Sequence, residues 1–268
     1  MYKRSISNLA WGKEYDTEMY QFLSDNNFEG IEIAPSRIFG DTPYSMTNEA
    51  RIFKNELLNQ YNLEISSMQS IWFGKNENIF RSSDERNRMF EYSKRAIEFA
   101  NILNCNNLVF GCPKNRYIPD NMNKNSCYSV AIEFFNKIGD YAKTNNVIFS
   151  IEANPTFYNT NFINTTSEAI DLIKEIDNDG IKLNFDLGTV KINKESLDEF
   201  SSIIEYINHI HISEPELKEV KKDDYNSSFI AMVSKMNYNK YISLEMKTQE
   251  IEIVKNCAML LKKGEQNG

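Results

Sequence analysis

The chain has 268 residues, of which 41% are hydrophobic and 25% charged, so it can bury a sizeable core and does not resemble a disordered chain. Its net charge of -8 argues against a nucleic-acid partner, because phosphate binding needs a clustered basic face. For this length we expect one domain over residues 1–268.

Short apolar, β-branched runs alternate with longer amphipathic stretches along the whole chain, which is typical of repeated βα units. The predicted strands are Arg4–Leu9, Gly30–Ala34, Leu63–Met68, Asn107–Gly111, Val147–Glu152, Ile181–Asp186, His209–Ser213 and Tyr241–Glu245. The predicted helices are Asp16–Asn26, Met46–Gln60, Ser83–Leu103, Ser126–Lys143, Thr166–Ile176, Lys194–Phe200, Tyr225–Met236 and Gln249–Lys262, with Ser82 or Ser83 as the cap of the third.

Eight strands, each followed by a helix, predict an α/β fold closed into a (β/α)8 TIM barrel. A doubly wound open sheet has the same alternation, but it usually carries a Gly-rich phosphate loop after its first strand. The segment Asn8–Gly12 has no such loop, which favours the barrel.

The N-terminus has no apolar segment behind Lys3 and Arg4, and no later stretch is long enough to span a membrane, so we expect a cytoplasmic protein with no membrane partner. The cysteines show no C-x-x-C spacing and are expected to be free thiols in a reducing compartment rather than disulfides or zinc ligands. They are Cys105, Cys112, Cys127 and Cys257.

Metal-binding residue types close four consecutive strands, at the end of the barrel where catalytic groups are found. They are Glu152, Asp186, His211 and Glu245. Burying three carboxylates together would be costly without a cation. Three oxygen donors and one imidazole favour one divalent ion, Mn²⁺ or Mg²⁺, with Co²⁺ and Zn²⁺ as alternatives. Taken singly, the glutamates could be rim ion-pair residues and His211 a core histidine; their coincidence favours the metal site.

The chain resembles the xylose-isomerase-like superfamily of β/α barrels, in particular sugar isomerases and epimerases related to tagatose and psicose 3-epimerases. The resemblance covers nearly the whole chain and is carried by SIEANP, NFDLGT, HIHISEP and SLEMK around the four residues above, and by ISNLAW and GIEIAP with Glu32. It implies that Glu152 and Glu245 act as acid and base on opposite faces of a carbon beside a carbonyl, with an enediolate intermediate stabilised by the metal.

Two positions depart from the pattern of the ketohexose epimerases. The chain has Thr189 where those enzymes usually have a histidine, and Pro215–Leu217 where an arginine is usual. Since both family positions contact substrate, the departures disfavour a free ketohexose as the substrate.

Further residues at the same end of the barrel are candidates for substrate binding. They are Trp11, Glu32, Gln69, Lys114, Arg116, Asn154 and Lys247, with Trp72 and Phe73 as further wall residues and Arg37 as a further cation. The cations could bind a phosphate, carboxylate or diphosphate, or could be ordinary loop charges; Lys247 could instead pair with Glu214. By strand alternation His209 should lie deeper than His211, in a core hydrogen-bonding role.

The leading hypothesis is therefore a metal-dependent isomerase or epimerase acting on a sugar, sugar phosphate or nucleotide sugar, with a homo-oligomer left open. A lyase or dehydratase of the same superfamily, or a non-catalytic sugar-binding barrel, are the alternatives.

Overall fold

The computed structural model describes residues 1–262, so residues 263–268 of the predicted domain lie outside it. Its strands form one parallel sheet in the order β1-β8-β7-β6-β5-β4-β3-β2. They are β1 (Lys3–Ile6), β2 (Gly30–Ile33), β3 (Glu64–Met68), β4 (Asn107–Phe110), β5 (Ile148–Glu152), β6 (Ile181–Asp186), β7 (Ile207–Ser213) and β8 (Tyr241–Glu245). A single bridge between Ser7 and Glu32 joins the two ends of the sheet, so the predicted (β/α)8 barrel is confirmed and is nearly closed.

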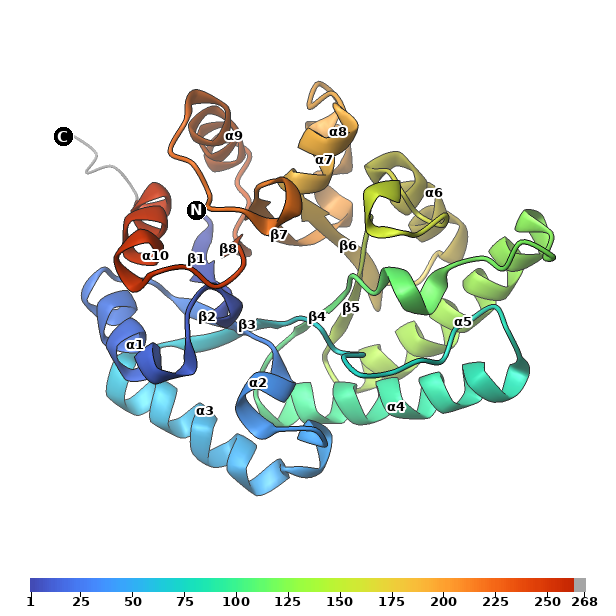
Figure 1. Ribbon diagram of the computed structural model, residues 1–268, viewed down its shortest axis with the longest axis horizontal. Helices are drawn as coiled ribbons and strands as arrows, with labels where there is room; N and C mark the ends of the chain where they lie inside the picture. The colour runs from blue at the N-terminus through green and yellow to red at the C-terminus, as the bar shows by residue number, and fades with distance from the viewer. Residues whose placement is uncertain (263–268) are drawn as a thin grey trace.

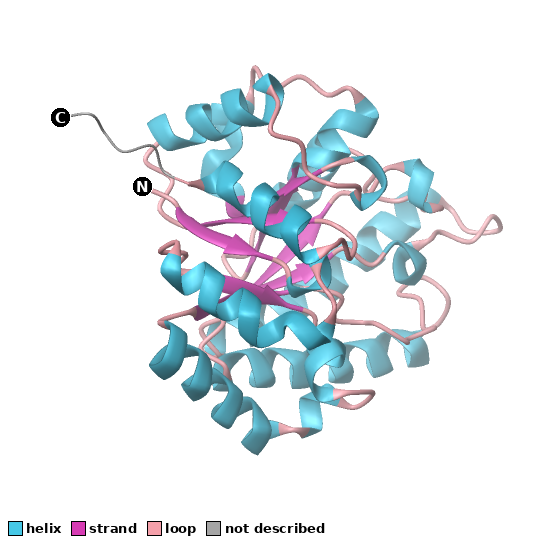
Figure 2. Cartoon of the chain, turned by 60° about the vertical axis from the view of Figure 1, so that its left-hand side comes forward, coloured by secondary structure: helices cyan, strands magenta, loops and turns pink. Residues whose placement is uncertain are grey.

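Helices surround the sheet on its outer side (Figures 1 and 2). They are α1 (Asp16–Asp25), α2 (Pro35–Phe39), α3 (Thr47–Tyr61), α4 (Ser83–Ile102), α5 (Lys124–Thr144), α6 (Thr166–Ile176), α7 (Leu187–Asn193), α8 (Phe200–Ile203), α9 (Asp224–Lys235) and α10 (Ile251–Ala258). Apolar side chains fill the space between the two layers, as where Phe110 of β4 packs on Phe135 of α5 with ring centroids 5.1 Å apart.

The predicted helix Lys194–Phe200 is wrong. Asp186, the last residue of β6, caps a helix that begins at once, because its side chain accepts hydrogen bonds from the backbone of Gly188 and Thr189. That helix, α7, ends at Asn193, and Lys194 adopts a left-handed conformation with φ of 56°. The chain becomes helical again only at α8, whose first residue is Phe200.

Polar side chains, rather than aliphatic ones, fill part of the barrel interior. Asn107 on β4 donates to Ser67 Oγ at 2.9 Å and accepts from Ser150 Oγ at 2.6 Å and from Asn208 Nδ2 at 2.7 Å. All four side chains are buried, and their mutual hydrogen bonds offset the cost of removing them from water. The interior therefore holds a satisfied polar layer that crosses four strands.

Within residues 1–262 no helix is both long enough and apolar enough to cross a bilayer. The four cysteines are buried and free, as expected from their spacing.

Candidate metal centre

Two glutamates converge on one imidazole nitrogen at the ends of β5, β7 and β8. His211 Nδ1 lies 3.1 Å from Glu152 Oε1 and 3.2 Å from Glu245 Oε2. The three ligand atoms that these residues offer all lie within 4.8 Å of one another, and His211 is fully buried. This geometry follows from the register, because parallel strands of a barrel bring their final residues to one end.

Asp186, the fourth predicted ligand, is the register partner of His211 on the neighbouring strand, but its carboxylate is turned toward α7. Its Oδ1 accepts from Ser213 Oγ at 2.5 Å and Gly188 N at 3.3 Å, and its Oδ2 from Thr189 N and Thr189 Oγ1, both at 2.8 Å. A carboxylate has about four acceptor positions, and four donor atoms lie around this one, although Thr189 Oγ1 and Gly188 N share their hydrogens with Ala153 O and Ser213 Oγ. Metal binding by Asp186 would displace at least one of these donors.

The surroundings of Asp186 disfavour an uncompensated negative charge. Burial, together with the nearby carboxylate of Glu152, raises the pKa of Asp186 above its ordinary value. A cation between these groups would favour both carboxylates in their charged forms.

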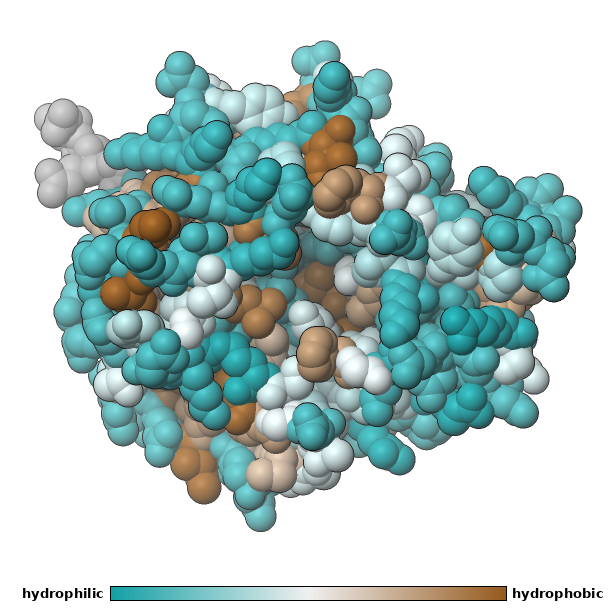
Figure 3. Space-filling model, in the orientation of Figure 1, coloured by the Kyte–Doolittle hydropathy of each residue, from teal (hydrophilic) through white to brown (hydrophobic). Residues whose placement is uncertain are grey.

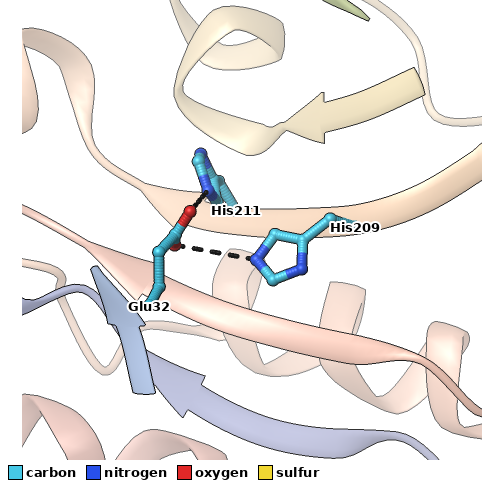
Figure 4. A group of neighbouring side chains, drawn as sticks. All are labelled: Glu32, His209 and His211. Carbon is cyan, nitrogen blue, oxygen red and sulfur yellow. Dashed lines mark hydrogen bonds and ion pairs between the residues drawn. The ribbon is translucent and has the colours of Figure 1, made fainter. Parts of the chain in front are cut away.

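Glu32 of β2 lies on the other side of His211, between the two histidines (Figure 4). Its Oε1 is 3.0 Å from His211 Nε2, its Oε2 is 3.6 Å from His209 Nε2, and its side chain is fully buried. With Nε2 donating to Glu32, a metal that displaces the Nδ1 proton would bind His211 between Glu152 and Glu245, the arrangement by which outer carboxylates orient metal-ligating histidines. In the structure Glu32 thus contacts the histidines; the sequence led us to expect a substrate contact of it.

The charges in this group influence one another strongly. Burial alone would raise the pKa of Glu32, but His211 and His209 outweigh it and hold that pKa well below its usual range. Burial alone would lower the pKa of His211, yet Glu32 and Glu245 hold it well above its usual range. Burial lowers the pKa of His209, in keeping with its expected core position. The ionised carboxylate of Glu32 thus stabilises a positive charge on His211.

Side-chain amides hold both glutamates. Asn184 Nδ2 donates to Glu152 Oε1 at 2.6 Å, and Asn154 Nδ2 donates to Glu152 Oε2 at 3.2 Å. Gln69 Nε2 donates to Glu245 Oε1 at 2.6 Å. Donors of this kind stabilise the ionised form of each carboxylate and fix its direction.

The residues present fit a divalent cation. One oxygen of each glutamate and His211 Nδ1 lie within 4.8 Å of one another, and a third carboxylate, that of Asp186, lies on the neighbouring strand. Oxygen donors with one imidazole suit Mn²⁺ or Mg²⁺, and also allow Co²⁺ or Zn²⁺.

The remaining substrate-binding candidates differ in burial and in their contacts with the two glutamates. Gln69 and Asn154 contact the glutamates, and fully buried Arg116 donates to Asn154 Oδ1 at 2.7 Å. By contrast, Lys114 is exposed and bonded to Asn76, and Lys247 is exposed. The expected cations therefore differ in burial: Arg116 is buried beside Asn154, whereas Lys114 and Lys247 are exposed.

Three other candidates have structural partners. Arg37 forms an ion pair with Asp16 at 2.7 Å, and the buried Trp11 indole donates to the same Asp16 at 2.8 Å. Trp72 is buried against Phe110, whereas Phe73 is 71% exposed. Glu214, considered as a partner of Lys247, pairs with Lys191 instead, at 2.6 Å.

Thr189, at the first departure from the family pattern, is buried, and the single hydrogen of its hydroxyl has two acceptors within reach, Ala153 O at 3.0 Å and Asp186 Oδ2 at 2.8 Å. Leu217, at the second departure, lies in the 3-10 turn η7 (Pro215–Leu217), where Glu216 and Leu217 both have positive φ. Thr189 therefore supports the carboxylate of Asp186 in this chain.

Tyr158 is a candidate that the sequence reasoning missed. It lies in η5 (Thr156–Tyr158), and its hydroxyl accepts a hydrogen bond from Glu216 N at 3.2 Å. Burial and the negative charge of Asp186 raise the pKa of Tyr158 to about 12, with smaller contributions from Glu245 and Glu152. The hydroxyl therefore stays protonated beside the carboxylates and has a hydrogen to donate. Only its spacing of six residues from Glu152 could have indicated it.

The face seen in Figure 1 is hollowed near its middle, within the ring of labelled strands (Figure 3). Glu152 and Asn154 are each 8% exposed, and the side chain of Glu245 is 12% exposed. Both glutamates are therefore largely buried, and each keeps a small area in contact with solvent.

Comparison with known families supports this reading of the fold. A family model described as xylose isomerase-like TIM barrel matches residues 20–263. No curated protein sequence matches the chain.

Several solved structures have the same architecture. A 3-keto-D-glucoside 4-epimerase from E. coli superimposes with a TM-score of 0.78 and 15% identity, covering 97% of this chain and 98% of the other. A D-psicose 3-epimerase from Clostridium cellulolyticum, solved with D-tagatose, superimposes with a TM-score of 0.74 and 16% identity, covering 96% of this chain and 95% of the other. A protein from Brucella melitensis described as an AP endonuclease of family 2 superimposes with a TM-score of 0.74 and 18% identity, covering 97% of this chain and 98% of the other. At such identities the similarity establishes the fold alone.

Proposed function

The chain belongs to the xylose isomerase-like TIM barrel family, and on that premise we propose that it is a metal-dependent isomerase or epimerase of a sugar or sugar derivative. The observation that carries the proposal is the convergence of Glu152 and Glu245 on His211 Nδ1 at the ends of the barrel strands. Two carboxylates on either side of one point can remove a proton from a carbon and return it.

In this proposal Glu152, His211 and Glu245 hold one divalent ion, Mn²⁺ or Mg²⁺ by donor type, and Asp186 completes the set by releasing one of its hydrogen bonds. The bound ion would supply Lewis-acid stabilisation of the charge that develops on the substrate carbonyl.

The chain's own residues then perform the proton transfers. One glutamate enters as the carboxylate and takes the proton from the carbon beside the carbonyl. The other enters protonated from solvent and returns its proton to the enediolate, from the opposite face in an epimerisation, and both recover their starting forms by exchange with solvent. Asn184 and Gln69 keep each carboxylate directed toward the reacting carbon through hydrogen bonds of 2.6 Å. The tyrosine hydroxyl of Tyr158 is available to donate to a substrate oxygen. The burial of the glutamates limits direct quenching of the carbanionic form by water.

Of the cations expected to bind an anion, Arg37 is paired with Asp16, Arg116 is buried beside Asn154, and Lys114 and Lys247 are exposed. We therefore place the reacting part of the substrate, a hydroxy ketone or hydroxy aldehyde, at the metal without assigning a charge to the remainder. Nuclease chemistry is disfavoured, because the chain has a net charge of -8 and only two histidines.

The test is solvent exchange. Candidate ketoses and keto-glycosides are incubated with Mn²⁺-loaded protein in D₂O, and deuterium at the carbon beside the carbonyl is followed by NMR. We expect incorporation that Glu152→Gln and Glu245→Gln abolish and that Glu64→Gln, at the start of β3, leaves unchanged. Failure of every substrate to exchange, or exchange that survives both substitutions, would contradict the proposal. Release of water into a deoxy or unsaturated product would indicate a lyase instead.

A further inference from the structure

Arg116 is the least satisfied buried charge near the proposed site. It ends the 3-10 turn η4 (Pro113–Arg116) that follows β4, and its side chain is fully buried. Its Nη2 donates to Asn154 Oδ1 at 2.7 Å, while Nε and Nη1 have no hydrogen-bond partner among the described residues. Among residues 1–262 no carboxylate lies close enough to Arg116 to form an ion pair with it. Such a guanidinium is costly to bury for stability alone.

Arg4 shows how this chain satisfies an arginine whose task is structural. Arg4 is 5% exposed, forms an ion pair with Glu29 at 3.3 Å, and donates to the backbone carbonyls of Asn26 and Asn27. Arg116 instead packs over the ring of Phe110 at 5.4 Å and donates to Asn154, which in turn contacts Glu152. Its contacts therefore lead to the site rather than to a local ion pair.

The hydrogen bond from Arg116 determines which way the Asn154 amide faces. A guanidinium has only donors, so it must receive the oxygen of the amide, and the NH₂ group then points the other way. That NH₂ group is the donor 3.2 Å from Glu152 Oε2. Arg116 thereby places a donor, and not an acceptor, against this glutamate.

The backbone before Arg116 leaves room for the same oxygen. Gly111 directly follows β4, and a Cβ built on it would overlap Glu152 Oε2. The segment from Gly111 to Arg116 thus affects the position of Glu152 Oε2 in two ways. Gly111 leaves space for this oxygen, and Arg116 orients the Asn154 amide that donates to it.

We propose that Arg116 is a positioning residue for Glu152: it fixes the Asn154 amide, which holds Glu152 Oε2 and leaves Glu152 Oε1 directed at the metal position beside His211. The inference rests on the proposed function only in taking Glu152 as a metal ligand. Substitutions of residues that orient ligands typically weaken metal binding by about 10- to 100-fold.

The experiment measures the Kd of Mn²⁺ by calorimetry, together with Tm, for wild type, Arg116→Met, Asn154→Ala and the double variant. We expect each single substitution to raise the Kd on the order of tenfold, and the double variant to be no weaker than the weaker single, since the two act in one chain of hydrogen bonds. Arg4→Met is the matched control: it loses a buried arginine too, and should lower Tm while leaving the Kd unchanged.

A folded Arg116→Met that binds Mn²⁺ as wild type does would overturn the proposal, as would independent, additive effects of the two substitutions. If Arg116→Met does not fold, the Mn²⁺ affinity of Asn154→Ala tests the proposal. A wild-type Kd in this variant would show that the hydrogen bond from Asn154 to Glu152 does not position the ligand.

A wild-type protein that binds no Mn²⁺, or a Glu152→Gln variant with wild-type affinity, would count against the proposed function instead. The positioning role is then judged from crystal structures without metal. Displacement of the Glu152 carboxylate in Asn154→Ala supports it, and an unmoved carboxylate overturns it.

Discussion

Glu32 and His211 face each other across 3.0 Å, with the carboxylate on the side of the ring away from Glu152 and Glu245. Because Nε2 donates to Glu32, a metal that displaces the proton of His211 Nδ1 would bind in the position between the two glutamates. The same carboxylate approaches His209, so one buried acid from β2 contacts both histidines of β7.

Glu32→Gln should weaken metal binding without unfolding the protein. The amide oxygen can still accept the Nε2 proton, but the negative charge that strengthens His211 as a ligand is lost. We expect the Kd of Mn²⁺, measured by titration calorimetry, to rise by about 10-fold. Glu64→Gln on β3 is the control, since that side chain is 54% exposed and pairs with Lys3, and it should bind Mn²⁺ as wild type does. Unchanged affinity in Glu32→Gln would remove the orienting role.

Gly111→Ala should impair the site more than the fold. The new methyl group would occupy the place of Glu152 Oε2, and this carboxylate is held by Asn154 and Asn184. We expect a loss of Mn²⁺ affinity of about 10-fold or more, with a small change in Tm.

Gly12→Ala is matched to it, because there too a Cβ would meet a glutamate carboxylate, that of Glu14, which is exposed and free to turn away. It should leave both Tm and affinity as they are. Equal effects of the two substitutions would show that the approach of Gly111 to Glu152 has no special importance.

Tyr158→Phe should separate substrate binding from metal binding. The hydroxyl accepts from Glu216 N and keeps its own hydrogen for another acceptor. We expect KM of an exchanging sugar to rise severalfold, by the roughly 0.5–1.5 kcal/mol of one hydrogen bond, while the Kd of Mn²⁺ stays the same. Tyr117→Phe, whose hydroxyl contacts only Asp120 at 3.4 Å among the described residues, is the control. A Tyr158→Phe enzyme with wild-type KM would exclude the contact.

Periodicity and strand-end polarity predicted most of this arrangement, because both depend on local sequence. The eight strands alternate with helices as expected, and Ser82, one of two predicted caps of α4, accepts from Glu85 N. Glu152 and Glu245, which end β5 and β8, meet His211 near the end of β7 because a closed parallel sheet brings these ends together.

Partnerships between loops distant in sequence were not predictable in the same way. Arg37 and Arg116 look alike in sequence as cations following strands, yet one pairs with Asp16 and the other is buried beside Asn154. The helix expected at Lys194–Phe200 was misplaced for a related reason: this segment is the connection between two short helices, α7 and α8, and it begins with a left-handed residue at Lys194. Tertiary contacts, rather than local pattern, decide such positions.

Asp186 has two possible roles, and Asp186→Asn tells them apart. Asparagine caps helices about as well as aspartate, so α7 should keep its start and Tm should change little. A neutral amide is a poorer ligand for a hard cation than a carboxylate. If Asp186 joins the metal set, the Kd of Mn²⁺ should rise by about 10-fold or more; if it serves only as the cap, the affinity should remain that of the wild type.

Ser213→Ala provides the opposite test of the same carboxylate. It removes the donor 2.5 Å from Asp186 Oδ1 and so frees an acceptor position without changing charge. In the ligand role, the metal no longer competes with Ser213, and Mn²⁺ affinity should stay the same or increase. A marked loss of affinity in Ser213→Ala would instead mean that the serine holds Asp186 in a productive orientation, and that the metal takes the place of Thr189 at Oδ2.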